Sequence, residues 1–277
     1  MNILTLNTHS WIEENPLEKL EQLAQGICSE NYDVIALQEV NQSMTASAVS
    51  TDEFFHAPKE NQVPIKDDNF ALCLVARLHE LGASYHWSWT ASHIGYDKYD
   101  EGLAILSKQP LEPTDFYASK SKDYTDYHTR RLLLAKTEIE GHEVVVVSVH
   151  FSWWKNDLGE EAFLHEWLTL KEQLEQVSVP IFVMGDFNNA AHVADEGYHY
   201  LTSQDTLSDS FVQARLHNGE FTVEHAIDGW SENSEKLRID YIFVSPVVQI
   251  EEYAVVFNSK QMPVVSDHFG VAVRGRL

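Results

Sequence analysis

Short apolar segments that end beside a polar residue recur along this chain of 277 residues. An apolar run of about four to eight residues is typical of a buried strand, and rigid strands hold groups more precisely than mobile loops. Six such runs place a carboxylate, amide or imidazole at a strand end: the residues are Asn7, Glu39, His150, Asp186, Asn188, Asp240, Asp267 and His268. A lone aspartate there is usually a turn former. Six placements in one chain indicate side chains that converge on one rim of a sheet.

The pattern predicts one α/β domain over residues 1–277, because no Gly/Ser-rich or Pro-rich linker interrupts it. An Asn15-Pro16 start predicts the first helix, Asn69 and Gly82 bound a second over about 70–81, and a third is expected over about 160–176. Residues 50–68 are polar and irregular and predict an excursion at one edge. The predicted strands are 2–7, 34–37, 85–91, 103–106, 132–139, 144–149, 181–184, 239–244, 251–256 and 269–273. Many strands with a few helices suggest packed sheets flanked by helices.

The charge balance argues against polyanionic partners. Forty-three acidic residues against nineteen basic ones give a net charge of −24. Nucleic-acid binding draws much of its affinity from basic residues that neutralise phosphates, and an acidic protein is repelled by anionic membranes. No basic stripe is evident, so neither nucleic acid nor a membrane is an expected partner.

The remaining bulk features favour the cytoplasm. No apolar stretch approaches the roughly 18 to 20 residues of a membrane helix, and the N-terminus does not resemble a signal peptide. Cys28 and Cys73 lie in apolar helical patterns, which is typical of small buried side chains in a reducing compartment. No obligate protein partner is evident.

The types of polar residue favour a hard divalent cation. Magnesium is usually bound by one or two carboxylates together with waters and substrate phosphate oxygens. Glu39 suits a direct ligand, with Asn7 and Asp267 nearby. A zinc site would favour closely spaced His and Cys, whereas the fourteen histidines are scattered. The sequence therefore predicts Mg²⁺, or Mn²⁺ in its place.

Seven short motifs follow one another along almost the whole chain: these are Thr5-Leu6-Asn7, Leu37-Gln38-Glu39-Val40, Glu101 to Ser107, Val149-His150, Gly185-Asp186-Phe187-Asn188, Arg238-Ile239-Asp240-Tyr241-Ile242 and Ser266-Asp267-His268. Together they resemble the motif series of the endonuclease/exonuclease/phosphatase superfamily, whose members include DNase-like nucleases, sphingomyelinases and inositol-phosphate phosphatases. The resemblance implies a DNase-like, four-layer α/β/β/α sandwich of two mostly antiparallel sheets flanked by helices. It places the site at one end of the two sheets.

The resemblance also implies a division of labour without a covalent intermediate. Glu39 would hold the metal, while Asp186 and Asn188 would orient or activate the attacking water. The remaining three residues would handle the phosphoryl group: Asp240 would orient His268, which with His150 would stabilise the phosphoryl oxygens or shuttle protons. Phosphoryl transfer mostly needs positioning and charge neutralisation, which such groups supply.

Three departures shift the expectation away from nucleases. Many nucleases of the superfamily carry Asn-x-Asp after the first strand, whereas this chain has Asn7-Thr8-His9. His150 stands where apurinic endonucleases have a tyrosine, and Glu101 before Gly102 is more typical of the sphingomyelinase and phosphatase branches. Glu101 is either a further polar group of the site or the solvated start of a strand.

Aromatic and basic residues beside the motifs suggest a small substrate. Trp11, Trp153 and Trp154 could form stacking walls with His9 nearby, although Trp153 and Trp154 could equally pack under the helix over 160–176. One of Arg130 and Arg131 could bind phosphate bidentately, and the other is expected to face solvent. These segments resemble those of bacterial maltose 6′-phosphate phosphatases of the superfamily.

The predicted activity is therefore magnesium-dependent hydrolysis of a phosphate monoester on a small cytoplasmic sugar phosphate. A sphingomyelinase-like phosphodiesterase and a nuclease are the alternatives. The first should carry a hydrophobic membrane-docking hairpin, which is not evident, and the second lacks its basic stripe. A non-enzymatic binding module is poorly compatible with so complete a set of polar residues.

Overall fold

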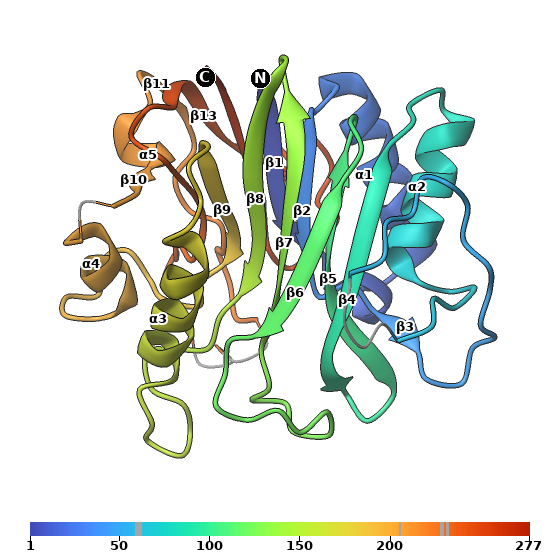
Figure 1. Cartoon of the computed structure of the whole chain (residues 1–277), viewed down its shortest axis with the longest axis horizontal. Coiled ribbons are helices and arrows are strands. Elements are labelled where there is room, and N and C mark those ends of the chain that lie inside the picture. Colours follow the sequence, from blue (N-terminus) through green and yellow to red (C-terminus); the bar gives the residue numbers. More distant parts are fainter. Residues whose placement is uncertain (59–62, 205, 228–229, 231–232) are drawn as a thin grey trace.

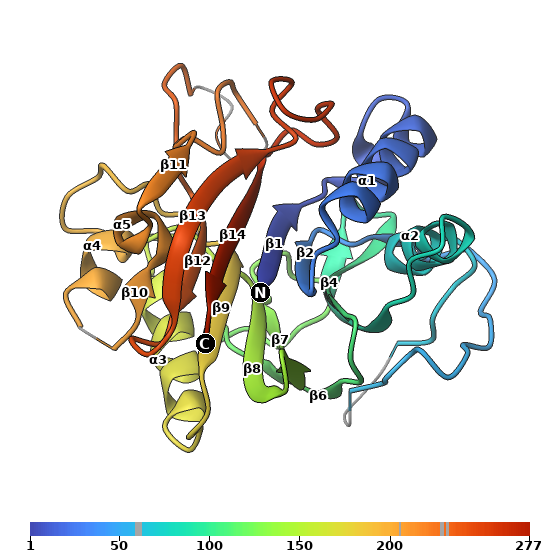
Figure 2. The same cartoon turned by 90° about the horizontal axis from the view of Figure 1, so that it is seen from above.

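The computed structural model describes residues 1–58, 63–204, 206–227, 230 and 233–277. Two sheets pack face to face with helices on both outer faces, as the layers in Figure 1 show. One sheet is covered by α1 (Pro16–Glu30) and α2 (Phe70–Glu80), and the other by α3 (Ala162–Leu174) and α4 (Gly197–Thr202) (Figure 2). The predicted four-layer α/β/β/α sandwich is confirmed.

The first sheet contains eight strands in the order β11-β13-β14-β1-β2-β5-β3, with β4 paired to β5. Only the β1–β2 and β11–β13 pairs among them are parallel in the described part of the chain. The strands are β1 (Asn2–Asn7), β2 (Val34–Gln38), β3 (Gln42–Ser43), β4 (His86–Gly95), β5 (Tyr99–Ser107), β11 (Leu216–Asn218), β13 (Gln249–Val256) and β14 (Gly270–Arg276).

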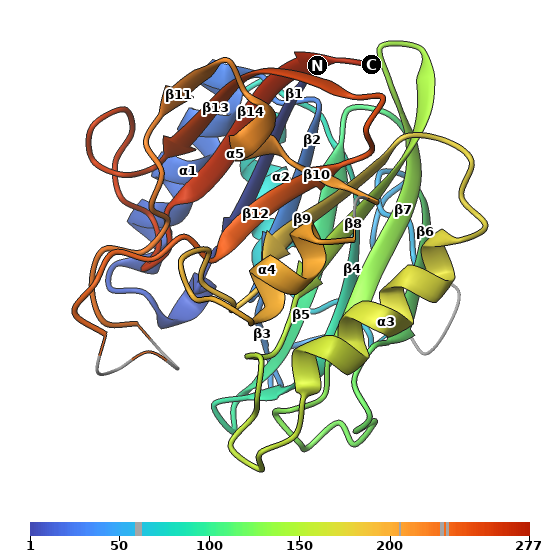
Figure 3. The same ribbon diagram turned by 90° about the vertical axis from the view of Figure 1, so that its left-hand side faces the viewer.

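The second sheet contains six strands in the order β10-β12-β9-β8-β7-β6. Its β8–β9 pair is parallel and the other pairs are antiparallel. The strands are β6 (Glu112–Tyr117), β7 (Arg131–Ile139), β8 (His142–His150), β9 (Ile181–Asp186), β10 (Ser208–Asp209) and β12 (Asp240–Val244). In the view of Figure 3, α3 and α4 lie in front of this sheet.

Alternation along the strands divides the apolar residues between two layers of core. In β2, Val34 and Ala36 join the core between the sheets, whereas Ile35 and Leu37 belong to the cluster beneath α1 and α2. This is the period of two expected for a strand buried on both faces. No helix within the described residues is long and apolar enough to span a membrane. Cys28 and Cys73 are unpaired and partly buried.

The strands extend beyond their apolar runs. β4 reaches Gly95 and β5 begins at Tyr99, because polar positions such as His93 and Glu101 also pair across this long hairpin. The sequence reading missed the elements with little apolar pattern: these are the 3₁₀ turn Ser10–Ile12, β3, β6, β10, β11, α4 and α5 (Ser210–Gln213).

Of the two asparagines predicted to begin helices, one makes a capping hydrogen bond and the other does not. Asn69 caps α2, since its side chain accepts a hydrogen bond from Leu72 N at 3.1 Å. Asn15 precedes α1 but has a φ of 56° and makes no side-chain cap bond. The predicted irregular excursion over 50–68 contributes isolated bridges at Phe55 and Lys66 in its described part, and residues 59–62 lie outside the described residues.

The register of the strands brings the predicted residues to one end of the sandwich. Asn7 pairs with Gln38 across β1 and β2, so Glu39 follows directly beside it. His150 pairs with Asp186 across β8 and β9, and Asp186 pairs with Asp240 at the start of antiparallel β12. The ends of both sheets therefore supply one cluster.

Candidate active site

A pocket of about 260 Å³ opens at this end of the sandwich. Its walls combine strand ends with the segments that connect strands. The lining residues are Glu39, His93, Gly95, Tyr96, Glu101, Tyr127, Arg130, His150, Trp153, Asp186, Asn188 and His268.

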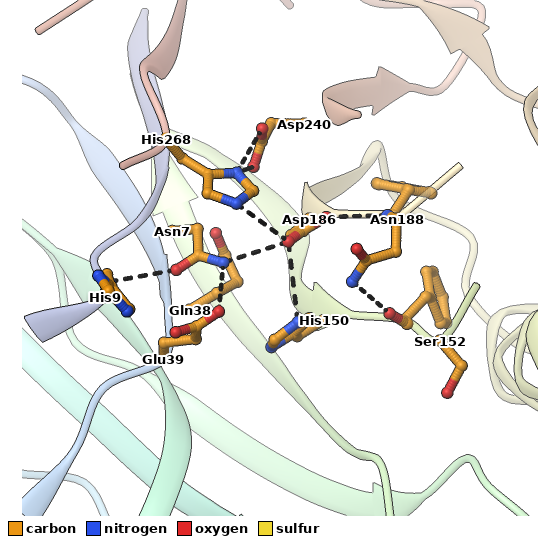
Figure 4. A network of polar contacts seen from close by, with 12 residues as sticks. Asn7, His9, Gln38, Glu39, His150, Ser152, Asp186, Asn188, Asp240 and His268 are labelled. Atoms are coloured by element: carbon orange, nitrogen blue, oxygen red, sulfur yellow. Dashed lines mark hydrogen bonds and ion pairs between the residues drawn. The ribbon is translucent and has the colours of Figure 1, made fainter. Parts of the chain in front are cut away.

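Asp186 lies at the centre of the polar network (Figure 4). Its Oδ2 accepts a hydrogen bond from Asn7 Nδ2 at 3.1 Å, and its Oδ1 accepts one from the backbone N of Asn188 at 2.8 Å. The Nε2 atoms of His150 and His268 lie 3.7 and 3.8 Å from Oδ2. Burial, followed by the charge of Asp240, raises the pKa of Asp186 to about 7. A carboxylate of such basicity can accept a proton from water at neutral pH.

His268 and His150 differ in protonation, although both face Asp186. The Nδ1 atom of His268 lies 2.9 Å from Asp240 Oδ2. Burial would lower the pKa of His268, but the charges of Asp240 and Asp186 raise it well above its ordinary value. Burial, followed by the charge of Arg130, holds the pKa of His150 well below the ordinary value. The site therefore offers one imidazolium and one neutral imidazole.

Glu39 has a carboxylate oxygen that no protein group satisfies. Its Oε1 accepts a hydrogen bond from Asn7 Nδ2 at 2.8 Å, whereas its buried Oε2 has no hydrogen-bond partner. Burial, followed by the charges of Glu101 and Asp267, raises the pKa of Glu39 to about 8. A buried carboxylate in this state is an expected partner for a cation.

A metal fits beside Glu39. Ligand atoms of Glu39, His150 and Asp186 all lie within 4.8 Å of one another. Magnesium prefers oxygen ligands and usually keeps several waters, so the two carboxylates suit it better than the imidazole does. Asn7 turns its Nδ2 toward both carboxylates, while its Oδ1 accepts a hydrogen bond from His9 N at 3.2 Å. In this arrangement Asn7 orients the carboxylates of Glu39 and Asp186 through its Nδ2 atom. Its Oδ1 atom is turned toward the backbone of His9.

His9 and Asp267 lie next to the pocket but are not among its lining residues. His9 Nδ1 lies 2.7 Å from Glu13 Oε1 and 3.8 Å from Asp267 Oδ1. The backbone N of Asp267 donates to the same Glu13 oxygen at 2.9 Å. Burial opposes protonation of His9, but its hydrogen bond to Glu13 and the charge of Asp267 raise its pKa to about 9. His9, Glu13 and Asp267 thus form a second cluster of ionisable side chains beside Glu39.

Arg130 and Glu101 form a charged wall of the pocket with His93. His93 Nε2 lies 3.3 Å from Glu101 Oε1, and Arg130 Nη1 donates to the carbonyl of Tyr127 at 2.8 Å. Burial would raise the pKa of Glu101, but the charge of His93 and then their hydrogen bond lower it to about 2. Glu101 is therefore a buried site group and not the solvated start of a strand.

The expectation that one of the two arginines faces solvent is wrong, because both are buried. Arg131 is buried, and its Nε lies 2.6 Å from the buried Asp115 Oδ2. Arg131 begins β7, where side chains alternate between the faces of the sheet. Arg130 is the member of the pair that lines the pocket.

The three tryptophans proposed as substrate walls have different surroundings. Trp153 lines the pocket. Trp154 packs instead on Phe163 of α3 and on Tyr200, with ring centroids 6.2 Å apart in both cases. Trp11 packs edge-to-face on Phe70, and its Nε1 donates to the carbonyl of Asp68 at 2.7 Å. The structure thus brings one of the three to the pocket.

Sequence reasoning missed His93, Tyr96, Tyr127 and Trp230. His93 pairs with Glu101 across the β4–β5 hairpin, a register that the short apolar runs did not reveal. Tyr96 lies in the turn of that hairpin and Tyr127 in the segment before β7. Trp230 Nε1 donates to Asn188 Oδ1 at 3.2 Å, while Asn188 Nδ2 donates to the carbonyl of Phe151 at 2.9 Å. The side chain of Asn188 is thereby fixed at both ends.

A model of the endonuclease/exonuclease/phosphatase family matches residues 3–268 of this chain. The structure of an endonuclease/exonuclease/phosphatase family protein from Leptotrichia buccalis C-1013-b is 33% identical, with a TM-score of 0.85 and 100% of both chains covered. No curated protein matches the chain significantly.

More distant structures share the fold. A mannosyl-6-phosphatase from Bacteroides thetaiotaomicron VPI-5482 has a TM-score of 0.67 at 18% identity, covering 100% of both chains. Truncated TDP2 from Caenorhabditis elegans has a TM-score of 0.63 at 16% identity, covering 100% of this chain and 97% of that chain. Identities this low show the fold alone. The near-complete match to the family model and the 33% identical relative show that this chain belongs to the endonuclease/exonuclease/phosphatase family.

Proposed function

We propose that the protein is a magnesium-dependent phosphomonoesterase that acts on a small sugar phosphate similar to maltose 6′-phosphate. Members of its family are metal-dependent hydrolases. The observation that carries the proposal is the pocket of about 260 Å³, which places an unsatisfied carboxylate oxygen of Glu39, the Asp240–His268 pair and the buried Arg130 around one space. Such a space suits a single terminal phosphate.

The metal would be held by Glu39, whose buried Oε2 has no hydrogen-bond partner, beside Asp186. When bound, a divalent cation draws charge from a phosphoryl oxygen and helps to orient the phosphate. The guanidinium of Arg130 can bind further phosphate oxygens in its fork of N–H donors. Manganese, which also accepts oxygen ligands, is expected to replace magnesium.

The protein groups around Asp186 suit attack by water on phosphorus. Asp186 has the basicity to take the proton of a water, and Asn188, fixed at both ends of its side chain, can orient that water. The imidazolium of His268, held by Asp240, neutralises negative charge on the phosphoryl oxygens. His150 is neutral and can donate a hydrogen bond. A bond forms between the water oxygen and phosphorus as the bond to the sugar oxygen breaks, and the departing sugar oxygen takes up a proton from the imidazolium of His268.

Several observations favour a small substrate over a polymer. The net charge of −24 opposes a long phosphate backbone. The pocket is small, and Trp153 supplies an aromatic wall. The mannosyl-6-phosphatase from Bacteroides thetaiotaomicron shows that this fold can serve a sugar phosphatase. The unpaired Cys28 and Cys73 support a cytoplasmic location and therefore a soluble intracellular substrate.

A phosphate-release screen with magnesium tests this function. The panel contains sugar phosphates, nucleotides, plasmid DNA and sphingomyelin, each measured with magnesium, with manganese and with a chelator. We expect sugar phosphates to give the highest kcat/KM and the chelator to abolish release. Preferential cleavage of DNA or sphingomyelin over every phosphomonoester would refute the substrate class.

A further inference from the structure

We propose that Tyr96, Tyr127 and Trp153 form a binding site for the second, unphosphorylated ring of a two-ring sugar phosphate. These three residues are called the aromatic rim below. They line the same pocket as the strand-end cluster but come from three connecting segments. The inference rests on the proposed function, because it assigns the part of the substrate that lies beyond the phosphorylated ring.

The exposure of the tyrosines is the first argument. Tyr96 and Tyr127 are 50% and 49% exposed, and they are the two exposed tyrosines among the eleven of the chain. Both line the pocket. Large aromatic side chains that remain open to solvent beside a site indicate a binding surface.

Tyr127 is exposed and yet fixed. Its hydroxyl donates to Asp157 Oδ2 at 2.8 Å, and its ring lies against that of His128 with centroids 4.0 Å apart and an interplanar angle of 31°. His128 is held in turn, because its Nε2 lies 2.6 Å from Asp157 Oδ1 and its Nδ1 lies 2.7 Å from Asp126 Oδ1. A side chain fixed before binding loses less conformational entropy on binding.

The segment that carries Trp153 is also fixed. Glu166 of α3 is buried, and its two carboxylate oxygens accept hydrogen bonds from Ser152 N at 2.8 Å and Ser152 Oγ at 2.7 Å. Asn189 Nδ2 donates to the carbonyl of Ser152 at 3.2 Å. Asp157, farther along the same segment, joins it to Tyr127. Tyr127 and the segment that carries Trp153 are therefore held in fixed positions relative to each other.

The volume of the pocket places the second ring at the rim. Pockets that enclose a whole drug-sized ligand have about 300 to 1,000 Å³. With about 260 Å³, this pocket has room for a phosphate and the ring that bears it, and little more. We place a further ring at the mouth, beside the exposed tyrosines that line the pocket.

The chemistry of the rim suits a neutral sugar ring. The face of an aromatic ring is electron-rich, so it attracts the C–H groups on the apolar face of a sugar. The Asp157 side chain is 61% exposed, and its carboxylate can accept hydrogen bonds from sugar hydroxyls in addition to its present two. Asp126 and Asp157 would repel a second phosphate. A monophosphate with an uncharged second ring is therefore the expected occupant.

The test compares maltose 6′-phosphate with glucose 6-phosphate as substrates of the magnesium-loaded protein. The wild type should have the higher kcat/KM for the two-ring substrate. Tyr127→Ala and Tyr96→Ala should each lower the ratio of the two kcat/KM values about three- to tenfold, mostly through KM, in line with one aromatic contact. Leu158→Ala, an exposed residue of the Asp157 segment, is the matched control and should leave the ratio unchanged.

Positioning of Tyr127 is tested separately. Asp157→Asn and Tyr127→Phe should lower the ratio by a smaller factor than Tyr127→Ala, and Tyr127→Trp should restore most of it. Far-ultraviolet circular dichroism and thermal melting identify any variant that fails to fold. Equal losses for both substrates in Tyr127→Ala, or no preference in the wild type, would overturn the proposal. A preference for adenosine 5′-monophosphate that disappears in Tyr127→Ala would assign the rim to a nucleobase and refute the sugar.

A failure of the proposed function gives a different result. If neither sugar phosphate is hydrolysed, calorimetric titration with unphosphorylated maltose still tests the rim. Heat of binding that Tyr127→Ala abolishes would support the rim in a protein of other activity. No binding to the wild type would overturn the rim together with the function.

Discussion

Asp186, Asp240 and His268 occupy the sheet side of the pocket, where they are buried at or beside strand ends and bonded or close to one another. Tyr96 and Tyr127 belong to the aromatic rim, where connecting segments leave about half of each side chain exposed. Strand ends hold charged groups in fixed geometry, as chemistry at phosphorus requires. Connecting segments tolerate changes of sequence and length more readily. We therefore expect the reaction on the sheet side and the choice of substrate at the rim.

The largest effect is expected on the sheet side. Asp186→Ala and His268→Ala should each lower kcat by about 10³-fold or more, because proton transfer and charge neutralisation at the phosphoryl group are lost. Steady-state kinetics on the best sugar phosphate measure this. Exposed Asp67→Ala and His192→Ala are matched controls.

The double variant sharpens the result. Groups that act as a unit lose activity non-additively, so Asp186→Ala/His268→Ala should be little worse than either single variant. Wild-type turnover in a folded single variant would break the assignment of chemistry to this side.

Glu39→Gln should weaken magnesium binding by about 10- to 100-fold, the range found for changes around metal ligands. Calorimetric titration with magnesium and the magnesium dependence of kcat measure the shift. The change also removes a buried negative charge that Glu101 and Asp267 repel, so above about pH 8, where Glu39 is ionised, the melting temperature in chelator should rise. An unchanged magnesium affinity would show that Glu39 is not a ligand.

The adjacent residues Arg130 and Arg131 should affect different quantities: Arg130 the binding of substrate, and Arg131 the stability of the fold. Arg130→Lys should raise KM about tenfold with a smaller change in kcat, because a lysine cannot offer the planar fork of donors. Arg131→Lys should leave KM unchanged but lower the free energy of unfolding, since it disturbs the buried ion pair with Asp115. Urea unfolding and kinetics distinguish the two, and a KM effect confined to Arg131 would reverse the assignment.

Glu166 holds the segment that carries Trp153, and we expect it to make the free energy of unfolding depend on pH. Burial raises its pKa to about 7, against an ordinary value near 4.5. The native state therefore binds a proton that the unfolded state releases, and the free energy of unfolding should fall as pH rises from 4.5 through 7. Glu166→Gln should remove about 1 to 2 kcal/mol of that fall. Parallel pH profiles of urea unfolding for wild type and variant would exclude this role.

The sequence did not predict which aromatic side chains line the pocket. Trp11, Trp153 and Trp154 all follow polar strand-end residues closely, and the sequence treated them alike. Trp11 packs on Phe70 and Trp154 on α3, while Trp153 lines the pocket. Their positions depend on helices that are distant in sequence. Tyr96 and Tyr127 carried no local pattern and were missed.

By itself the sequence determined packed sheets flanked by helices and the meeting of Glu39, Asp186, Asp240 and His268, while the four-layer order was implied by the family resemblance. The first two depend on local patterns: apolar runs specify strands, and polar residues at strand ends can converge on one rim of a sheet. The tertiary structure decided that His9 and Asp267 stand beside the pocket, that Arg131 is buried in an ion pair, and that two tyrosines form its rim. The physical reason is that connecting segments are positioned by contacts such as Tyr127 with Asp157, which join residues 30 positions apart and leave no periodic signal.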